Sequence, residues 1–346
     1  MRMISNPFRA VGLSHKDLTD VPYPSINADA PQALLARCPH AGITPLVDAP
    51  TVAIACNVAQ VLIKDERTRM GLGSFKALGA AYVIASDAAK GKARGATYVT
   101  ASAGNHGLSV AAGAAAFGAR SVIFLAQTVP EVFAARLRDM GAEVVRAGAN
   151  YEASMDAAMQ NAADTGAILL SDSSWVGYTS RPHVLMEGYL ALMAEVFTQI
   201  DAPPTHLFLQ AGVGGLAGAC AALARATWGD ATRITVVEPD AAACLIASVE
   251  AGAPIETTGP SSAMGRLDCK VPSLIALKGL ARDADYFMTI SEAEGAAGAD
   301  QSAAHGFEST PSGAAGIAGL LAADRTVLGL DAASRVLIIL SEQAET

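Results

Sequence analysis

The chain has 346 residues, of which 51% are hydrophobic and only 16% charged. This composition excludes a disordered chain and allows one large domain or two closely packed ones with a substantial core. The formal net charge of −9 is spread along the chain without a basic block, so nucleic acid and anionic membrane surfaces are poor partners.

The first residues, MRMISNPFRAVGLSHKD, show no apolar run of signal-peptide length. No apolar stretch approaches the roughly 20 residues that span a bilayer. Five scattered cysteines form no CxxC pair, which is typical of reduced thiols: Cys38, Cys56, Cys220, Cys244 and Cys269. We therefore predict a cytoplasmic protein without a membrane partner.

Residues 1–50 are rich in Pro, Asn and Asp and are predicted to be irregular structure that wraps the fold. After them, short apolar runs predict strands at 58–66, 95–102, 120–126, 142–148, 167–172, 205–212, 233–240, 285–291 and 335–342. Most of these runs are apolar on both faces, as in fully buried parallel strands.

Ala-rich segments with helical spacing alternate with these strands, at 75–90, 108–118, 129–141, 151–166 and 313–323. Several of them end in Gly, as helices often do. The alternation predicts an α/β fold of two lobes with parallel-rich sheets. We expect a large cofactor-binding domain from 1–90 and 200–346, and a small mobile domain from 91–199.

The first segment that carries chemistry is Gly-Leu-Gly-Ser-Phe-Lys-Ala-Leu-Gly, residues 71–79. Lys76 opens a helix after a Gly-rich turn. Burial and the positive helix end both act to lower the pKa of such an amine, which can then form a Schiff base with an aldehyde. The alternative is a surface lysine on an amphipathic helix.

The second segment runs from a strand through Ser102-Ala103-Gly104-Asn105-His106-Gly107 into an Ala-rich helix. Exposed backbone N–H groups at such a helix start suit a substrate carboxylate. Asn105 is placed to hydrogen-bond a ring substituent of a cofactor. The alternative, which we weigh equally, is a tight turn with a helix cap.

The third segment, residues 205–224, is a strand followed by Gly212, Gly214 and Gly215 and then a helix. This order forms a phosphate cradle. With Glu238 near the end of the next strand it also imitates a dinucleotide-binding fingerprint, so a nicotinamide-dependent oxidoreductase is a rival hypothesis.

One cofactor suits all three segments, and it is pyridoxal 5′-phosphate. Its aldehyde matches the lysine, its ring hydroxyl the asparagine, and its phosphate the glycines. Four of the six histidines, at 106, 183, 206 and 305, show no metal-ligand spacing, so no catalytic metal is predicted.

From about Pro45 onward the chain resembles the fold-type II pyridoxal-phosphate enzymes, the group of threonine dehydratase and the tryptophan synthase β-subunit. Within that group it is most similar to the diaminopropionate ammonia-lyases. The resemblance rests on an ordered series of motifs at 62–66, 71–76, 104–107, 172–175, 177–179, 210–215, 237–240 and 308.

The resemblance implies that Lys76 carries the cofactor and that Asp172 takes part in deprotonating an L-substrate. It further implies a ring nitrogen that faces a hydroxyl, for which Ser341 is the first choice and Ser312 the alternative. The implied cofactor contacts are Phe75, Lys76, Asn105, Gly212, Val213, Gly214, Gly215, Leu216, Glu308, Ser312 and Ser341. The expected substrate contacts are Ser102, Ala103, Gly104, His106, Tyr178, Arg266 and Asp268.

Two departures from the lyase pattern concern specificity. Ala103 stands where the lyases have an aspartate associated with the D-substrate, so we expect activity on L-substrates only. The segment 264–270 is more charged than its small-residue counterpart in the lyases, and Arg266 and Asp268 are expected to shape the pocket unless this is a solvated loop.

The predicted function is therefore elimination of an amine from the β-carbon of a small L-amino acid, such as 2,3-diaminopropionate or an N-substituted derivative. The nearest alternative is a dehydratase of serine, threonine or 3-hydroxyaspartate, and a protein that binds the cofactor without turnover is a third possibility. The resemblance also implies a homodimer.

Overall fold

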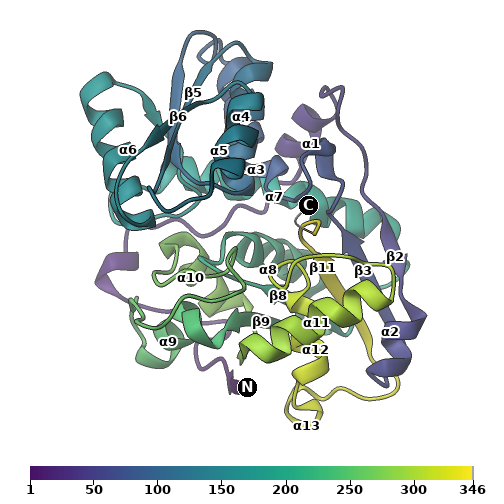
Figure 1. Ribbon diagram of the computed structural model, residues 1–346. Coiled ribbons are helices and arrows are strands. Elements are labelled where there is room, and N and C mark those ends of the chain that lie inside the picture. Colours follow the sequence, from purple (N-terminus) through teal and green to yellow (C-terminus); the bar gives the residue numbers. More distant parts are fainter. Residues whose placement is uncertain (345–346) are drawn as a thin grey trace.

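The structure of the protein, a computed structural model, describes residues 1–344. Two sheets form the framework, one of seven strands and one of four. Figure 1 shows the four-stranded sheet and its helices above the seven-stranded sheet, with the C-terminus close to the junction between them. The predicted α/β fold with two parallel-rich sheets is confirmed.

The large sheet has the order β1-β10-β9-β8-β11-β3-β2. Its strands are β1 (Arg2–Ser5), β2 (Leu46–Asp48), β3 (Gln60–Asp65), β8 (His206–Gln210), β9 (Arg233–Pro239), β10 (Tyr286–Ile290) and β11 (Arg335–Leu340). The five inner strands are parallel, and both edge strands, β1 and β2, are antiparallel to their neighbours.

The small sheet has the order β6-β5-β4-β7 and is parallel throughout. Its strands are β4 (Thr97–Ala101), β5 (Arg120–Leu125), β6 (Glu143–Arg146) and β7 (Ile168–Leu169). All nine strands predicted from apolar runs are present. Seven of them are mostly buried and therefore apolar on both faces, whereas β6 and β7 are partly exposed. The strands of the small sheet lie within 91–199, but the mobility of this part remains a prediction.

The helices are α1 (Asp29–Leu35), α2 (Pro50–Ala55), α3 (Ala77–Ala89), α4 (Asn105–Ala116), α5 (Glu131–Asp139), α6 (Tyr151–Thr165), α7 (Ser180–Gln199), α8 (Gly215–Trp228), α9 (Cys244–Ala251), α10 (Leu274–Asp283), α11 (Glu292–Ala304), α12 (Ala315–Ala322) and α13 (Arg325–Leu328). The predicted helices correspond to α3, α4, α5, α6, α8 and α12. Within residues 1–344, no helix is both long and apolar enough to cross a membrane.

The prediction that residues 1–50 are irregular is wrong in part. They contain β1, β2 and α1, and β1 pairs with β10 nearly three hundred residues later in the chain. Strands of three or four residues carry too little apolar pattern to be recognised, and the distant partner that stabilises them is a tertiary feature.

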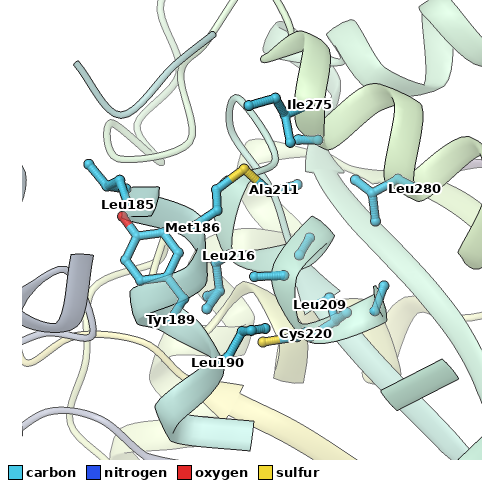
Figure 2. Close-up of a cluster of buried hydrophobic side chains, with 14 of the residues drawn as sticks. Leu185, Met186, Tyr189, Leu190, Leu209, Ala211, Leu216, Cys220, Ile275 and Leu280 are labelled. Carbon is cyan, nitrogen blue, oxygen red and sulfur yellow. The ribbon is translucent and has the colours of Figure 1, made fainter. Parts of the chain in front are cut away.

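Helices α7 and α8 form the centre of the main hydrophobic core. Figure 2 shows Leu185, Met186, Tyr189 and Leu190 of α7 around α8, with Ile275 and Leu280 of α10 on the other side. Helix α3 lies close to α7 because residue 79 is a glycine, where a Cβ would stand 2.6 Å from a ring carbon of Tyr189. This packing fixes the start of α3, and with it Lys76, relative to the large sheet.

Candidate active site

Lys76 occupies the N-cap of α3 with helical backbone angles. The N–H of the preceding Phe75 donates to the carbonyl of Ser341 at 3.1 Å, which ties this turn to the end of β11. The Lys76 Nζ lies 5.4 Å from the centre of the Phe75 ring, and the side chain is 22% exposed. Lys76 is thus enclosed but reachable, which excludes the simple surface-lysine alternative.

The Lys76 ammonium donates a hydrogen bond to the Asp172 carboxylate. Burial acts to lower the pKa of Lys76, but the charge of Asp172 outweighs it and the pKa is raised. Burial likewise acts to raise the pKa of Asp172, but the charge and hydrogen bond of Lys76 outweigh it, and the pKa of Asp172 is strongly lowered. The sequence-based expectation of a lowered lysine pKa is therefore wrong for this state, because a distant carboxylate supplies the missing counter-charge.

Three further side chains surround this pair, and none was predicted. The buried Tyr189 hydroxyl and the Cys269 thiol both interact electrostatically with Lys76 and Asp172. Burial raises the pKa of the Cys269 thiol to about 12, so this group stays neutral near pH 7. Tyr151 at the start of α6 interacts with Asp172 and Cys269, although half of its surface is exposed. Nothing in the local sequence of these residues marks them, because the site forms only where distant segments meet.

The turn 102–107 lies opposite, at the start of α4, where no side chain caps the helix. The Ser102 hydroxyl accepts a hydrogen bond from the Gly104 N–H at 3.3 Å. Asn105 donates through its amide to the carboxylate of Glu342, which also accepts from Thr310. Glu342 was not predicted as a site residue, and it links the small-sheet turn to the end of β11.

His106 is buried, and its Nε2 lies 2.8 Å from the carbonyl of Leu170. Burial lowers the pKa of His106, so the ring is neutral near pH 7. A neutral ring that donates to Leu170 from Nε2 leaves Nδ1 as an acceptor, and this buried atom has no hydrogen-bond partner among the described residues.

The glycine loop at the start of α8 is a cradle that larger residues would fill. Gly214 has a φ of +95°, a left-handed conformation that favours glycine. A Cβ on Gly212 would lie 2.9 Å from the Cys269 sulfur, and one on Gly214 would lie 3.0 Å from Ala276. No side chain caps α8, and the N–H groups of its first turn are therefore candidates to bind an anion. Val213 and Leu216 belong to the same loop and first turn.

Ser341 and Ser312 are both buried and lie on either side of Gly313, whose carbonyl accepts from the Ser341 N–H at 3.3 Å. The Ser312 hydroxyl accepts from the Arg266 N–H at 3.1 Å. Glu308 is exposed, and its backbone carbonyl accepts from Arg67 at 3.1 Å. The structure brings both candidate hydroxyls to one place but does not choose between them.

Tyr178 stacks on Trp175, and its hydroxyl is engaged with the backbone. This hydroxyl donates to the Leu169 carbonyl at 2.9 Å and accepts from the Ser171 N–H at 3.1 Å. Tyr178 therefore holds the end of β7 and the turn that carries Asp172.

Arg266 and Asp268, the charged residues of the loop before α10, have different surroundings. Arg266 lies 3.8 Å from the Glu342 carboxylate and 3.2 Å from the position that a Cβ of Gly104 would take. Asp268 lies 2.7 Å from the Lys270 ammonium. A cavity of about 450 Å³ is lined by Ala263, Gly265, Arg266, Ser309, Thr310, Pro311, Ser312 and Glu342.

Glu238 does not support a nicotinamide site. Its carboxylate is fully buried and accepts from the N–H groups of Leu245 and Ile246, both at 2.8 Å. Burial raises the pKa of Glu238 to about 8, although these N–H groups act to lower it. A carboxylate enclosed in this way is unable to reach a ribose hydroxyl, so the dinucleotide reading of the glycine loop is wrong.

The residues present fit pyridoxal phosphate. The uncapped start of α8 is a partner for the phosphate. The enclosed amine of Lys76 is a partner for the aldehyde, and the amide of Asn105 is a partner for the ring hydroxyl. The buried Tyr189 hydroxyl lies close enough to Lys76 to interact with it, so it also faces the place where the aldehyde would be held.

Comparison with known proteins agrees with this geometry. Residues 38–342 match the family described as pyridoxal-phosphate dependent enzyme. The diaminopropionate ammonia-lyase of Salmonella typhimurium is 31% identical over 351 residues, which cover 88% of this chain and 86% of that protein. The biosynthetic L-threonine dehydratase of Escherichia coli is 32% identical, but over only 57% of this chain and 36% of its own length.

A solved structure of Escherichia coli diaminopropionate ammonia lyase, in complex with an aminoacrylate–PLP azomethine intermediate, superposes with a TM-score of 0.88. The two sequences are 27% identical, and the match covers 99% of this chain and 93% of the other. The family match over residues 38–342 includes every strand except β1 and every segment of the candidate site. The chain therefore belongs to the fold-type II pyridoxal-phosphate-dependent enzymes, and within them to the group of the diaminopropionate ammonia-lyases.

Proposed function

We propose that this protein removes the β-substituent from a small L-amino acid and releases a 2-oxo acid and ammonia. With L-2,3-diaminopropionate, one water is consumed and the products are pyruvate and two molecules of ammonia. The observation that carries the proposal is the contact between Lys76 and Asp172 beside the cradle of α8. The similarity to diaminopropionate ammonia-lyases over most of the chain supports the choice of an amine as leaving group.

Pyridoxal phosphate, when bound, withdraws electrons from the α-carbon of the substrate amine and so permits loss of the α-proton. Lys76 would hold the cofactor covalently, with Phe75 against its ring. The N-terminus of α8, from Gly212 to Leu216, would hold the phosphate. Asn105 would exchange its present partner, Glu342, for the ring hydroxyl.

Lys76 and Asp172 are the groups placed to move the α-proton. The positive charge of Lys76 holds the pKa of Asp172 low, whereas burial acts in the opposite direction. When Lys76 is no longer an ammonium, burial is no longer outweighed by that charge, and Asp172 becomes a better proton acceptor. Tyr178, through the backbone at residues 169 and 171, keeps this carboxylate in position.

The turn 102–107 would bind the substrate carboxylate. Its N–H groups lie at the uncapped start of α4, where the helix dipole favours an anion. The buried, neutral His106 supports this turn through its bond to Leu170. Ser341 and Ser312 remain the candidates for the hydroxyl at the ring nitrogen.

A dehydratase is the second candidate, since loss of a β-hydroxyl needs the same α-proton transfer. The similarity to threonine dehydratases over part of the chain favours it. We also propose that the protein is a cytoplasmic homodimer, on the basis of the resemblance and of its five free cysteines. Light scattering on the purified protein tests the dimer.

The function is tested with the absorbance spectrum of the purified holoenzyme, followed by assays of 2-oxo acid release. The panel contains L-2,3-diaminopropionate, L-serine and L-threonine. The proposal expects a visible Schiff-base band and fastest release from the diamine. A faster reaction with the hydroxy amino acids would establish the dehydratase instead. Absence of the band after addition of pyridoxal phosphate would refute both.

A further inference from the structure

Arg266 extends from a rigid loop of the large-sheet part toward the turn that begins α4. The side chain of Met264 is fully buried, the Leu267 N–H donates to the Met264 carbonyl at 2.8 Å, and the Arg266 N–H donates to the Ser312 hydroxyl at 3.1 Å. The backbone of Arg266 is therefore fixed, and its side chain starts from a defined point.

The guanidinium crosses to the opposite wall of the site. Its Cζ and Nη1 both lie 3.2 Å from the position that a Cβ of Gly104 would take, so the guanidinium is in close contact with this turn. It also lies 6.0 Å from the centre of the Phe133 ring on α5. A positive charge thus stands directly beside the turn proposed to bind the substrate carboxylate.

The other charges of the loop are engaged elsewhere. Lys270 contacts Asp268 at 2.7 Å and donates to the carbonyls of Ala241 and Pro260 at 2.7 and 2.8 Å. Arg266 interacts with Glu342, whose carboxylate also accepts from Asn105 and Thr310. A guanidinium has five N–H donors in a planar fork, so it is able to hold Glu342 and a second carboxylate together.

We propose that Arg266 selects substrates with a second carboxylate on or beyond the β-carbon. The α-carboxylate does not require this arginine, because the uncapped start of α4 already supplies N–H donors for it. The cavity of about 450 Å³ that Arg266 lines with Ser309, Thr310 and Ser312 offers polar space for the additional group.

For turnover, the inference rests on the proposed elimination. A suitable substrate is 3-(carboxymethylamino)-L-alanine, in which the bond between the β-carbon and nitrogen breaks. The reaction consumes one water and yields pyruvate, ammonia and glycine. L-2,3-diaminopropionate, which lacks the second carboxylate, is the elimination substrate for comparison.

The first test measures the binding of L-aspartate and of L-alanine to the holoenzyme. The change in cofactor absorbance reports the binding. Neither has a β-leaving group, so this test does not depend on elimination. The wild type is expected to bind L-aspartate about tenfold or more tightly than L-alanine, as for a charge-assisted hydrogen bond. Equal affinities for the two amino acids in the wild type overturn the inference without any variant.

The second test repeats both titrations with Arg266→Gln, Arg266→Lys and Lys270→Gln, and adds the kcat/KM ratio of the two elimination substrates. Arg266→Gln should remove the preference for L-aspartate over L-alanine, and Arg266→Lys should keep part of it. Lys270→Gln removes the same charge from the same loop and should leave the preference unchanged. A preference that survives Arg266→Gln overturns the inference, as does an equal loss of affinity for both amino acids. If the preference follows Arg266 but no substrate is eliminated, the selectivity holds and the proposed function is wrong.

Discussion

The ammonium of Lys76 is hydrogen-bonded to the carboxylate of Asp172, although the two residues are 96 positions apart in the chain. Lys76 opens the helix α3, whereas Asp172 follows the last strand of the small sheet. Each group controls the protonation of the other, since the pair keeps the lysine charged and the aspartate ionised in spite of burial. The proposed proton transfers depend on this mutual control.

Replacement of Lys76 by alanine removes the amine that would hold the cofactor. We expect the visible Schiff-base band to disappear and turnover to fall by at least about a thousandfold, as when a group that acts in every step is lost. Circular dichroism of the variant would show that the fold persists. A variant that keeps both the band and the activity would contradict the assignment.

Asp172→Asn removes the charge that raises the pKa of Lys76. Burial then dominates, so the lysine pKa should fall and the free amine should form at lower pH. The measurement is the rate at which the cofactor-free protein takes up pyridoxal phosphate, as a function of pH. The half-maximal rate should move to lower pH in the variant, and elimination from the L-substrate should slow about a hundredfold or more. An unchanged uptake profile would show that the two groups are not coupled.

The enantiomer preference should follow from Ala103, since the resemblance implies an aspartate at this place in the lyases. Its methyl group packs beside the small apolar cluster that includes Leu108 and Leu137. We expect pyruvate from L-2,3-diaminopropionate and none above background from the D-enantiomer. Ala103→Asp restores the carboxylate and should permit measurable turnover of the D-form. Comparable wild-type rates with both enantiomers would disprove the role assigned to this position.

A buried ion cluster around Glu195 should be essential for stability. Glu195 of α7 contacts Lys64 at 2.6 Å and Arg69 at 2.7 Å, and all three side chains are almost fully buried. Arg69 also pairs with the buried Glu66 at 2.7 Å, so Glu195→Gln leaves two buried cations with one carboxylate, which we expect to cost about 3–5 kcal/mol of unfolding free energy. Urea denaturation measures this loss. The exposed Glu131, which pairs with Arg138 and Arg146 at the surface, serves as the control, and Glu131→Gln should leave stability nearly unchanged.

Stability should also depend on pH through Glu238. Burial raises the pKa of this carboxyl from an ordinary value of 4.5 to about 8. Between these values the folded protein retains a proton that the unfolded chain releases, so the free energy of unfolding falls as the pH rises. Denaturation of the wild type at pH 6 and pH 8.5 should show this fall, and Glu238→Gln, which does not ionise, should show a smaller one. Identical pH dependence in the two proteins would mean that Glu238 is ionised in the fold.

The α/β class, the nine strands and the three segments proposed to bind the cofactor could be predicted from the sequence. These features are local. A buried parallel strand is apolar on both faces wherever it lies, and an anion cradle needs only a strand, a few glycines and a helix in direct succession. Lys76 and the loop from Gly212 to Gly215 were recognisable for this reason.

The electrostatics of the site could not be predicted from the sequence, because the interacting groups come from distant segments. The raised pKa of Lys76 depends on Asp172, and the isolation of Glu238 depends on the start of α9. Glu342, Tyr151 and the orientation of Arg266 toward Gly104 were likewise hidden, because their partners come from other segments. Charge interactions act through space over a few ångströms, and the chain brings these groups within that distance only when the two sheets and their helices pack together.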